Sequence, residues 1–407
     1  MYLHLGIAKG EEGMTLTKKH YIKFLIYGYL IAKPFYFLNT PFQIADIILL
    51  ALFFILLSKE DEHCSISAGA KSSLHYYTCF MLWVILVNLA WFFVLGISKG
   101  FGLEAVNFFT NSVYYVFNGI AMIVILWAYG LLEEELARIF VKGCFLSCMF
   151  TVLCSFVLNN GGAERQTAGF SNPNQLAYYG VIVLTAGVLW GHLLEKKRLL
   201  LLVISALYLN FISLSKAGII SCLFLVALCL LCGRGMKNSG IFNHKVKLFC
   251  VLLGIFGLIA LFLMEIVGNG NSILMRVIDR LLGMRNEKDS NLGSGRGYNR
   301  IFEMGTNFLW GMGEGGYDRF QIMNGKEIHS TFVSIYVCYG VVGLMLSVIT
   351  MMKLVLCTRD WFFKLLSFSG IFLYCITHNG VRNTIVWMMF TLIAVSGQSN
   401  MEECTNE

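Results

Sequence analysis

Charged side chains are scarce in this sequence, and their scarcity decides the class of protein. Only 14% of the 407 residues are charged, whereas 57% are hydrophobic. Soluble globular proteins carry about 25% charged residues. A chain of this composition has too much apolar surface to hide in a water-facing fold. The sequence therefore predicts an integral membrane protein.

Several signatures of enzymes and nucleotide-binding proteins are missing from the sequence. It has no HExxH or other metal-ligand cluster, no GxSxG elbow and no GxxxxGK[ST] phosphate loop. Gly311, Gly313 and Gly316 match GxGxxG, but no strand precedes them, as a dinucleotide site would require. A tight backbone turn near a ligand fits these glycines better. We expect no metal, no cofactor and no nucleic-acid partner, because the net charge of +7 also serves to orient a membrane protein.

The 13 cysteines form no recognisable framework. Most lie within apolar runs, and the CxxC of Cys229 and Cys232 is embedded in LFLVALCLLCG. We interpret these cysteines as packing residues. The longest polar loop contains none, so we expect no disulfide framework there.

The apolar runs are continuous and have the length of membrane-crossing helices, about 17–25 residues. They lack the alternation that a transmembrane barrel requires. We predict an all-α, polytopic transmembrane domain over residues 1–407 with about 12 spans. The predicted spans cover residues 21–38, 42–58, 75–98, 107–130, 139–158, 173–192, 199–215, 217–232, 247–267, 328–352, 361–377 and 383–397.

One apolar run, residues 199–232, is too long for a single span. Its 34 residues would extend about 51 Å as one helix, against a hydrocarbon core of about 30 Å. The run is interrupted by SLSKAG. We therefore predict two short helices with Lys216 at the turn between them.

Lys and Arg are unevenly distributed between alternate segments. With the N-terminus inside, the inner segments hold 18 of them and the short outer segments hold 5. The other 8 lie in one long outer loop, residues 268–327, and loops of that length cross regardless of charge. We predict cytoplasmic N- and C-termini and an uncleaved first apolar run. The long extracytoplasmic loop is expected to carry an amphipathic helix within NRIFEMGTNFLWG, residues 299–311.

This topology places unusual polar residues on the outer side. Arg165 is the one base of a Gly-rich loop, and Lys216 lies within apolar sequence, where an ionisable group is a functional hypothesis by default. Snorkelling at the interface explains both about equally well. His329 opens a span after the basic loop and suits a general base, although a lone histidine is more often structural. His378 and Arg382 form a second small polar cluster.

Four motifs follow one another between residues 160 and 345. RQTAGFSNPNQLA leads into a span, with Asn172 or Ser171 suited to cap it and Pro173 to its first position. SLSKAG ends a short span, and SGRGYNRIFEMGTNFLWGMGEGGYDRF combines SGR, an amphipathic segment, G-x-G and an aromatic. HSTFVSIYVCYGVVG opens a span that ends in YG-hydrophobic-hydrophobic-G. Together they resemble the O-antigen polymerase and ligase superfamily of bacterial envelope polysaccharide synthesis. Lys216 stands where that family commonly has Arg, which loses bidentate geometry, and Ser330 where Asn is frequent.

The resemblance implies a GT-C-like architecture in the bacterial cytoplasmic membrane and metal-independent glycosyl transfer on its outer face. A Wzy-type polymerase would join repeat units carried on undecaprenyl pyrophosphate, with a chain-length regulator and a flippase as partner proteins. His329 would be the general base, with Glu164, Asp318 and Glu327 as alternatives. The pyrophosphate would be bound by Arg165, Lys216, Arg296 and Arg300. The supporting residues would be Asn172, Asn174, Gly311, Gly313, Ser330, His378 and Arg382.

Two other functions stay open. O-antigen ligase, which transfers finished glycan to lipid A–core, shares these motifs. A flippase or transporter for the same lipid-linked unit would predict internal repeats and charges that open to both sides. The sequence shows no such repeat, and its unusual charges lie on one predicted side.

Labelling of an engineered cysteine tests the predicted orientation. In Ser290→Cys the new thiol lies in the predicted extracytoplasmic loop. In intact cells a membrane-impermeant maleimide is therefore expected to label this variant more strongly than the unsubstituted protein. Ser239→Cys places the thiol in a predicted cytoplasmic segment and serves as the control, labelled only after permeabilisation. The opposite pattern would overturn the orientation.

Overall fold

The computed structural model describes eleven stretches of the chain, and within them it is almost entirely helical, without a strand. These stretches are residues 4–35, 43–57, 68–99, 107–158, 165–232, 297–298, 300–314, 328–356, 358, 360–380 and 383–396. A helix occupies each predicted span except residues 247–267, which lie outside the described residues. The prediction of an all-α protein is therefore confirmed for the described part of the chain.

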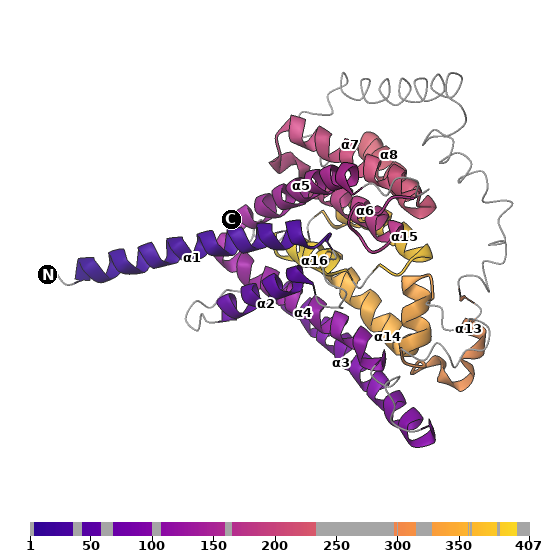
Figure 1. Cartoon of the computed structure of the whole chain (residues 1–407). Coiled ribbons are helices and arrows are strands. Elements are labelled where there is room, and N and C mark those ends of the chain that lie inside the picture. The colour runs from indigo at the N-terminus through magenta and orange to yellow at the C-terminus, as the bar shows by residue number, and fades with distance from the viewer. Residues whose placement is uncertain are drawn as a thin grey trace, which may run out of the picture.

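The helices follow one another in a simple order (Figure 1). They are α1 His4–Ala32, α2 Ile44–Leu57, α3 Ala68–Lys99, α4 Asn107–Leu132, α5 Glu134–Val157, α6 Pro173–Trp190, α7 Lys196–Ser213, α8 Lys216–Cys232, α13 Arg300–Glu303, α14 Thr331–Leu356, α15 Trp361–Thr377 and α16 Thr384–Ser396. Two 3-10 turns, η2 Gly191–Leu193 and η5 Gly305–Phe308, lie between them.

Five of the described helices are long and apolar enough to cross a membrane. These stretches are Lys71–Ile97, Ser112–Leu132, Glu134–Val157, Pro173–Leu193 and Thr331–Leu356. Shorter apolar helices of 10–17 residues are found at Ile44–Leu57, Lys216–Ala227, Trp361–Thr377 and Thr384–Ser396. The composition and the helices together support a membrane protein, and the full set of about 12 spans stays a prediction.

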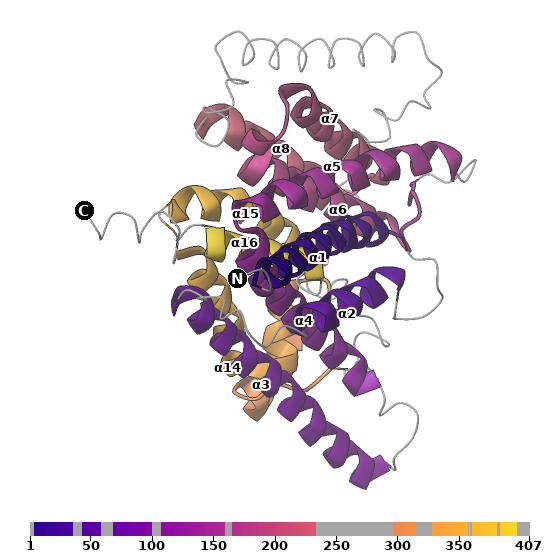
Figure 2. The same cartoon turned by 90° about the vertical axis from the view of Figure 1, so that its left-hand side faces the viewer.

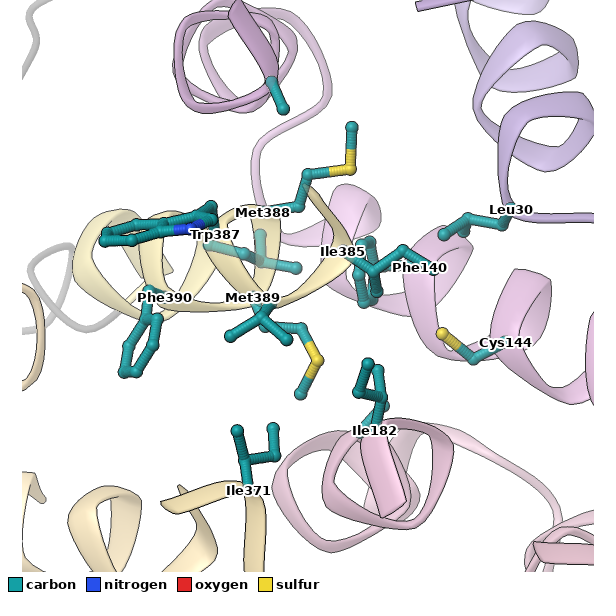
Figure 3. Close-up of a cluster of buried hydrophobic side chains, with 14 of the residues drawn as sticks. Leu30, Phe140, Cys144, Ile182, Ile371, Ile385, Trp387, Met388, Met389 and Phe390 are labelled. Atoms are coloured by element: carbon teal, nitrogen blue, oxygen red, sulfur yellow. The ribbon is translucent and has the colours of Figure 1, made fainter. Parts of the chain in front are cut away.

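Two helices form the centre of the molecule. In α6 every residue from Leu176 to Trp190 is buried, and α16 is buried from Thr384 to Val395. Helices that are apolar on all sides belong inside a bundle. Figures 1 and 2 show α5 to α8 on one side of α16, with α2 to α4 and α14 on the other. In Figure 3 the side chains of α16 meet Phe140, Ile182 and Ile371 from neighbouring helices.

Glycines allow α6, α7 and α8 to approach one another closely. A Cβ at Gly180 in α6 would lie 3.1 Å from the Ala206 carbonyl oxygen of α7 and would overlap the amide of Asn210. A Cβ at Gly218 in α8 would overlap the same amide and lie 2.7 Å from the Cβ of Ala177. Small residues at such crossings are typical of membrane helices, where tight packing replaces the hydrophobic effect.

The predicted break within residues 199–232 is present. Helix α7 ends at Ser213, Leu214 has a left-handed backbone with φ of 50°, and α8 begins at Lys216. The Ser215 hydroxyl accepts a hydrogen bond from the Gly218 N–H at 3.5 Å and caps the new helix. An apolar run that is longer than the bilayer is thick is thus divided at its polar residues. There they can form hydrogen bonds with the backbone groups left unpaired at the two helix ends.

The predicted amphipathic helix at residues 299–311 does not form as one element. The four-residue helix α13 is followed by η5, whose first residue, Gly305, has a φ of +52°. That left-handed residue interrupts the helical path, which apolar spacing alone does not reveal. The segment is nevertheless two-faced, because Phe302 is 88% exposed whereas Met304 is buried against Ile328 and Val337.

A partly buried ion pair joins the first two helices. Lys33 Nζ lies 2.9 Å from Asp46 Oδ1, and the two side chains are only 17% and 11% exposed. The other Asp46 carboxylate oxygen accepts a hydrogen bond from the Gln43 N–H at 3.0 Å. One turn before Lys33, the Tyr29 hydroxyl is hydrogen-bonded to the Thr384 hydroxyl at the start of α16. These contacts fix α1, α2 and α16 at the same end of the bundle.

Breaking this ion pair on one side is expected to destabilise the protein. Lys33→Met leaves the Asp46 charge without its cation and should lower the free energy of unfolding by about 3 kcal/mol. Lys33→Met/Asp46→Asn removes both charges, keeps the cap oxygen and should recover most of the loss. Lys23→Met breaks the exposed pair with Glu135 and is the control, with a cost below about 1 kcal/mol. Thermal unfolding in detergent measures these differences, and equal losses for the single and double variants would refute the explanation.

Candidate functional site

Arg165 is held between the start of α6 and the end of α7. Its Nε donates a hydrogen bond to the Ser213 carbonyl oxygen at 2.9 Å, and a terminal guanidinium N–H donates to Asn174 Oδ1 at 2.7 Å. The next residue, Gln166, donates its N–H to the Ile212 carbonyl oxygen at 3.0 Å. Lys216 begins α8 three residues after Ser213. Two predicted cation positions and Asn174 are therefore brought to the same turn.

The NPN sequence sets the position of Asn174. Asn172 has an extended backbone and its side chain accepts a hydrogen bond from the Gln175 N–H at 2.9 Å, while Pro173 is the first helical residue. Before it, Ala168 and Gly169 have φ of 48° and 92°, and they turn the chain toward the cap. The structure thus explains Asn172 as the helix cap and leaves Asn174 as the member of the motif that contacts Arg165.

A tyrosine that the sequence analysis missed extends this contact. The Tyr374 hydroxyl, near the end of α15, donates a hydrogen bond to the Asn174 carbonyl oxygen at 2.6 Å. The Tyr374 ring stacks on Tyr178 of α6, with centroids 4.6 Å apart, and on His378, with centroids 4.7 Å apart. No sequence signal singled out Tyr374, because an aromatic residue in an apolar run is usually core.

The two predicted histidines belong to one cluster. The rings of His329 and His378 have centroids 6.4 Å apart and are inclined by 69°. His378 Nδ1 lies 3.0 Å from the Thr377 hydroxyl, and the His378 carbonyl oxygen accepts a hydrogen bond from the Thr331 hydroxyl at 3.1 Å. The same Thr331 oxygen accepts from the Gly380 N–H at 2.9 Å. Thr331 therefore joins the loop after α15 to the start of α14.

Two further residues fix the backbone on either side of His329. The Tyr298 hydroxyl lies 3.1 Å from the His329 carbonyl oxygen and 3.0 Å from the Ile376 carbonyl oxygen. The Ser330 hydroxyl caps α14 by accepting from the Val333 N–H at 3.4 Å, and it lies 3.5 Å from the Cys375 carbonyl oxygen. Ser330 thus has a local structural role, while the His329 side chain is exposed.

Helix α14 is broken inside its apolar run, and the loop glycines meet this break. Gly340 has φ of 69° and ψ of −170°, which interrupts the helix. The carbonyl oxygens of Val337 and Cys338 accept hydrogen bonds from the N–H groups of Met312 and Gly313, at 2.9 and 2.8 Å. In an apolar environment every such group needs a partner within the protein. We name residues 309–314 the strap.

Two tryptophans of α3 complete the contact between the strap and α14. The Trp83 indole N–H donates to the Tyr339 carbonyl oxygen at 2.9 Å, and that of Trp91 donates to the Gly311 carbonyl oxygen at 3.1 Å. The Trp83 ring also stacks on Trp310, with centroids 5.5 Å apart. A Cβ at Gly311 would overlap the Cys338 carbonyl, and one at Gly340 would overlap the Leu309 carbonyl. This close backbone contact accounts for Gly311, and Gly313 has a left-handed backbone with φ of 69°.

The remaining predicted residues have different placements. Arg300 opens α13 and is completely buried, in the segment whose Met304 packs on Ile328. Several other predicted residues lie outside the described residues, namely Arg296, Arg382, Gly316, Glu164, Asp318 and Glu327. The described cluster therefore consists of Arg165, Asn174, Tyr374, His378 and His329, with Lys216 at its edge.

This cluster combines two kinds of chemistry at one end of the bundle. Arg165 and Lys216 supply positive charge, which suits an anionic group such as a phosphate. The histidines supply imidazoles, which can accept or donate a proton near neutral pH. Within the described residues, no group of three His, Cys, Asp or Glu side chains is arranged to bind a metal ion.

No known family model matches the chain, and no curated protein matches it. The resemblance described above therefore depends on the four motifs between residues 160 and 345 and on their order along the chain.

Substitution of Gly311 tests the strap. Gly311→Ala adds a Cβ at a φ of +84°, where it would overlap the Cys338 carbonyl. It should cost roughly 1–2 kcal/mol for the left-handed backbone and about 1–3 kcal/mol more for overpacking. Gly305→Ala is the matched control, because its φ is also positive but nothing lies within 4 Å of the added Cβ. Thermal unfolding should show the larger loss for Gly311→Ala, and equal losses would contradict the contact.

Proposed function

We propose that this protein is a membrane glycosyltransferase that polymerises oligosaccharide repeat units carried on undecaprenyl pyrophosphate. One observation carries the proposal. Residues that the family resemblance assigns to a single site, from Arg165 to His378, lie in one connected cluster although they come from four separate segments. The proposal includes a GT-C-like bundle of about 12 spans with the cluster at the outer face of the bacterial cytoplasmic membrane.

The proposed reaction assigns a role to each side of the cluster. The cations at Arg165 and Lys216 stabilise the negative charge that builds up on the leaving pyrophosphate. His329 accepts the proton of the attacking sugar hydroxyl. The new bond forms between that oxygen and the anomeric carbon, and the bond from the anomeric carbon to the pyrophosphate oxygen breaks. Attack from the opposite side inverts the anomeric centre.

The two substrates also need an apolar environment for their lipid tails. Many large hydrophobic side chains at the periphery of the bundle are exposed. Among them, Ile97 on α3 is 81% exposed and Phe156 on α5 is 66% exposed. Such surfaces suit the bilayer, where polyprenyl chains are dissolved. A donor and an acceptor would therefore reach the cluster from the membrane with their head groups at the outer surface.

Loss of the proposed base tests this function. His329→Ala should lower polymer formation by about 10²–10⁴-fold, because general base catalysis contributes that much to rate. The measurement is glycan length on gels after complementation of a strain that lacks the gene, with membrane levels of the protein checked. His192→Ala is the matched control, since His192 is exposed at the opposite end of α6 and should leave polymer unchanged.

The glycan that remains separates the polymerase from its alternatives. Single repeat units on lipid A–core or on the cell surface, without long polymer, would support a polymerase. Loss of all surface glycan with polymer accumulating on the lipid carrier would support a ligase. Lipid-linked units trapped on the cytoplasmic side would support a flippase. Normal polymer with stable His329→Ala would remove His329 from the mechanism.

A further inference from the structure

Tyr374 contacts both chemical halves of the cluster. Its hydroxyl reaches Asn174, whose side chain contacts Arg165, and its ring reaches His378, whose ring faces His329. The side chain is only 2% exposed, so these contacts occur inside the protein.

The hydroxyl is linked to the Arg165 guanidinium through Asn174. Two of the guanidinium donors are engaged by the Ser213 carbonyl oxygen and by Asn174 Oδ1. Because the guanidinium is planar, two such contacts fix its plane and the direction of its other donors. Asn174 lies in the first turn of α6, and the Tyr374 hydroxyl bonds its carbonyl oxygen at 2.6 Å. A shift of that turn would therefore move the Arg165 donors.

The ring determines where the His378 imidazole lies. Tyr374 and His378 stack with an interplanar angle of 26°, and Tyr178 stacks on Tyr374 with an angle of 24°. The Thr377 hydroxyl lies 3.0 Å from His378 Nδ1. The Tyr178 side chain is enclosed in turn, since a Cβ at Gly380 would lie 2.7 Å from its hydroxyl oxygen. The stack gives His378 a fixed orientation toward His329.

Packing alone does not explain a tyrosine at this position. A phenylalanine would provide the same ring without a buried hydroxyl, and a buried hydroxyl is costly unless it is hydrogen-bonded. Here the hydroxyl is bonded to the helix turn that holds the arginine, and the ring to a histidine. We propose that Tyr374 is a positioning residue that sets the distance and angle between the cationic side and the imidazole side of the site. This inference rests on the proposed function.

Two substitutions separate the contributions of the hydroxyl and the ring. Tyr374→Phe keeps the stack and removes the hydrogen bond to Asn174. It should weaken binding of undecaprenyl pyrophosphate by about five- to tenfold, as expected for one hydrogen bond. It should also lower kcat, because Arg165 stabilises the charge that builds up on the leaving pyrophosphate. Tyr374→Leu also removes the stack on His378 and should lower kcat further than Tyr374→Phe does. The protein is purified in lipid nanodiscs, and binding, kcat, KM and melting temperature are measured on the same samples.

Tyr179→Phe is the matched control. Tyr179 is the neighbour of Tyr178 in α6, it is equally buried, and its hydroxyl donates to Ser147 of α5 at 2.5 Å. The substitution removes this hydroxyl, and with it a buried tyrosine hydrogen bond of the same kind that lies outside the cluster. We expect Tyr179→Phe to lower the melting temperature without changing binding or kcat.

A double-mutant cycle tests whether the hydroxyl acts through Asn174. Asn174→Ala removes the contact with Arg165, so Tyr374→Phe should have almost no further effect on binding in that background. Independent, multiplicative effects would overturn the inference, as would equal effects of Tyr374→Phe and Tyr179→Phe on binding. If Tyr374→Leu does not fold, Tyr374→Phe and the cycle still decide the outcome.

The wild-type protein separates a failure of this inference from a failure of the proposed function. If the wild-type protein binds undecaprenyl pyrophosphate and Tyr374→Phe binds it equally well, only the positioning role is rejected. Absence of wild-type binding and of polymer formation would reject the proposed function, and this inference with it. Weakened binding by Tyr374→Phe, with a melting temperature no lower than that of Tyr179→Phe, would support both.

Discussion

A peptide group inside an apolar bundle must find its hydrogen-bond partner within the protein, and this constraint governs the architecture of the site. It is most visible where α14 is broken at Gly340. The carbonyl groups released there are bonded by the strap and by an indole of α3, so the segment that precedes α14 is fixed against the helix. The same segment provides Tyr298, which contacts the backbone at His329.

The cluster is formed by polar contacts between the ends of different helices and not by one continuous sequence motif. Arg165 bonds across α6 and α7, Tyr374 bonds α15 to α6, and Thr331 bonds α14 to the loop after α15. Each bond also satisfies a backbone or side-chain group at the end of a helix. Stability and the geometry of the candidate site therefore depend on the same contacts, and that geometry depends on how the helices end.

The sequence predicted those features that depend on local length and composition. Apolar runs predicted the described helices, and a run longer than the bilayer predicted the turn before Lys216. Local spacing also predicted a helix at residues 299–311, which was wrong because the helical path is interrupted where Gly305 adopts a left-handed backbone. Tyr374 could not be predicted, because its contacts arise only when distant helices pack together. The family resemblance alone assigned the two histidines to one site. The break at Gly340 was equally hidden, since its glycine occurs inside an uninterrupted apolar run.

The interruption of α14 has a mechanical consequence for His329. The segment from Thr331 to Tyr339 is separated by the non-helical Gly340 from the rest of the helix, and it is tied to α3, α15 and the strap. A continuous helix transmits tilt and rotation along its whole length, whereas a broken one allows its two parts to move as separate bodies. The long part of α14 after Gly340 can therefore change its tilt without moving the short part that follows His329.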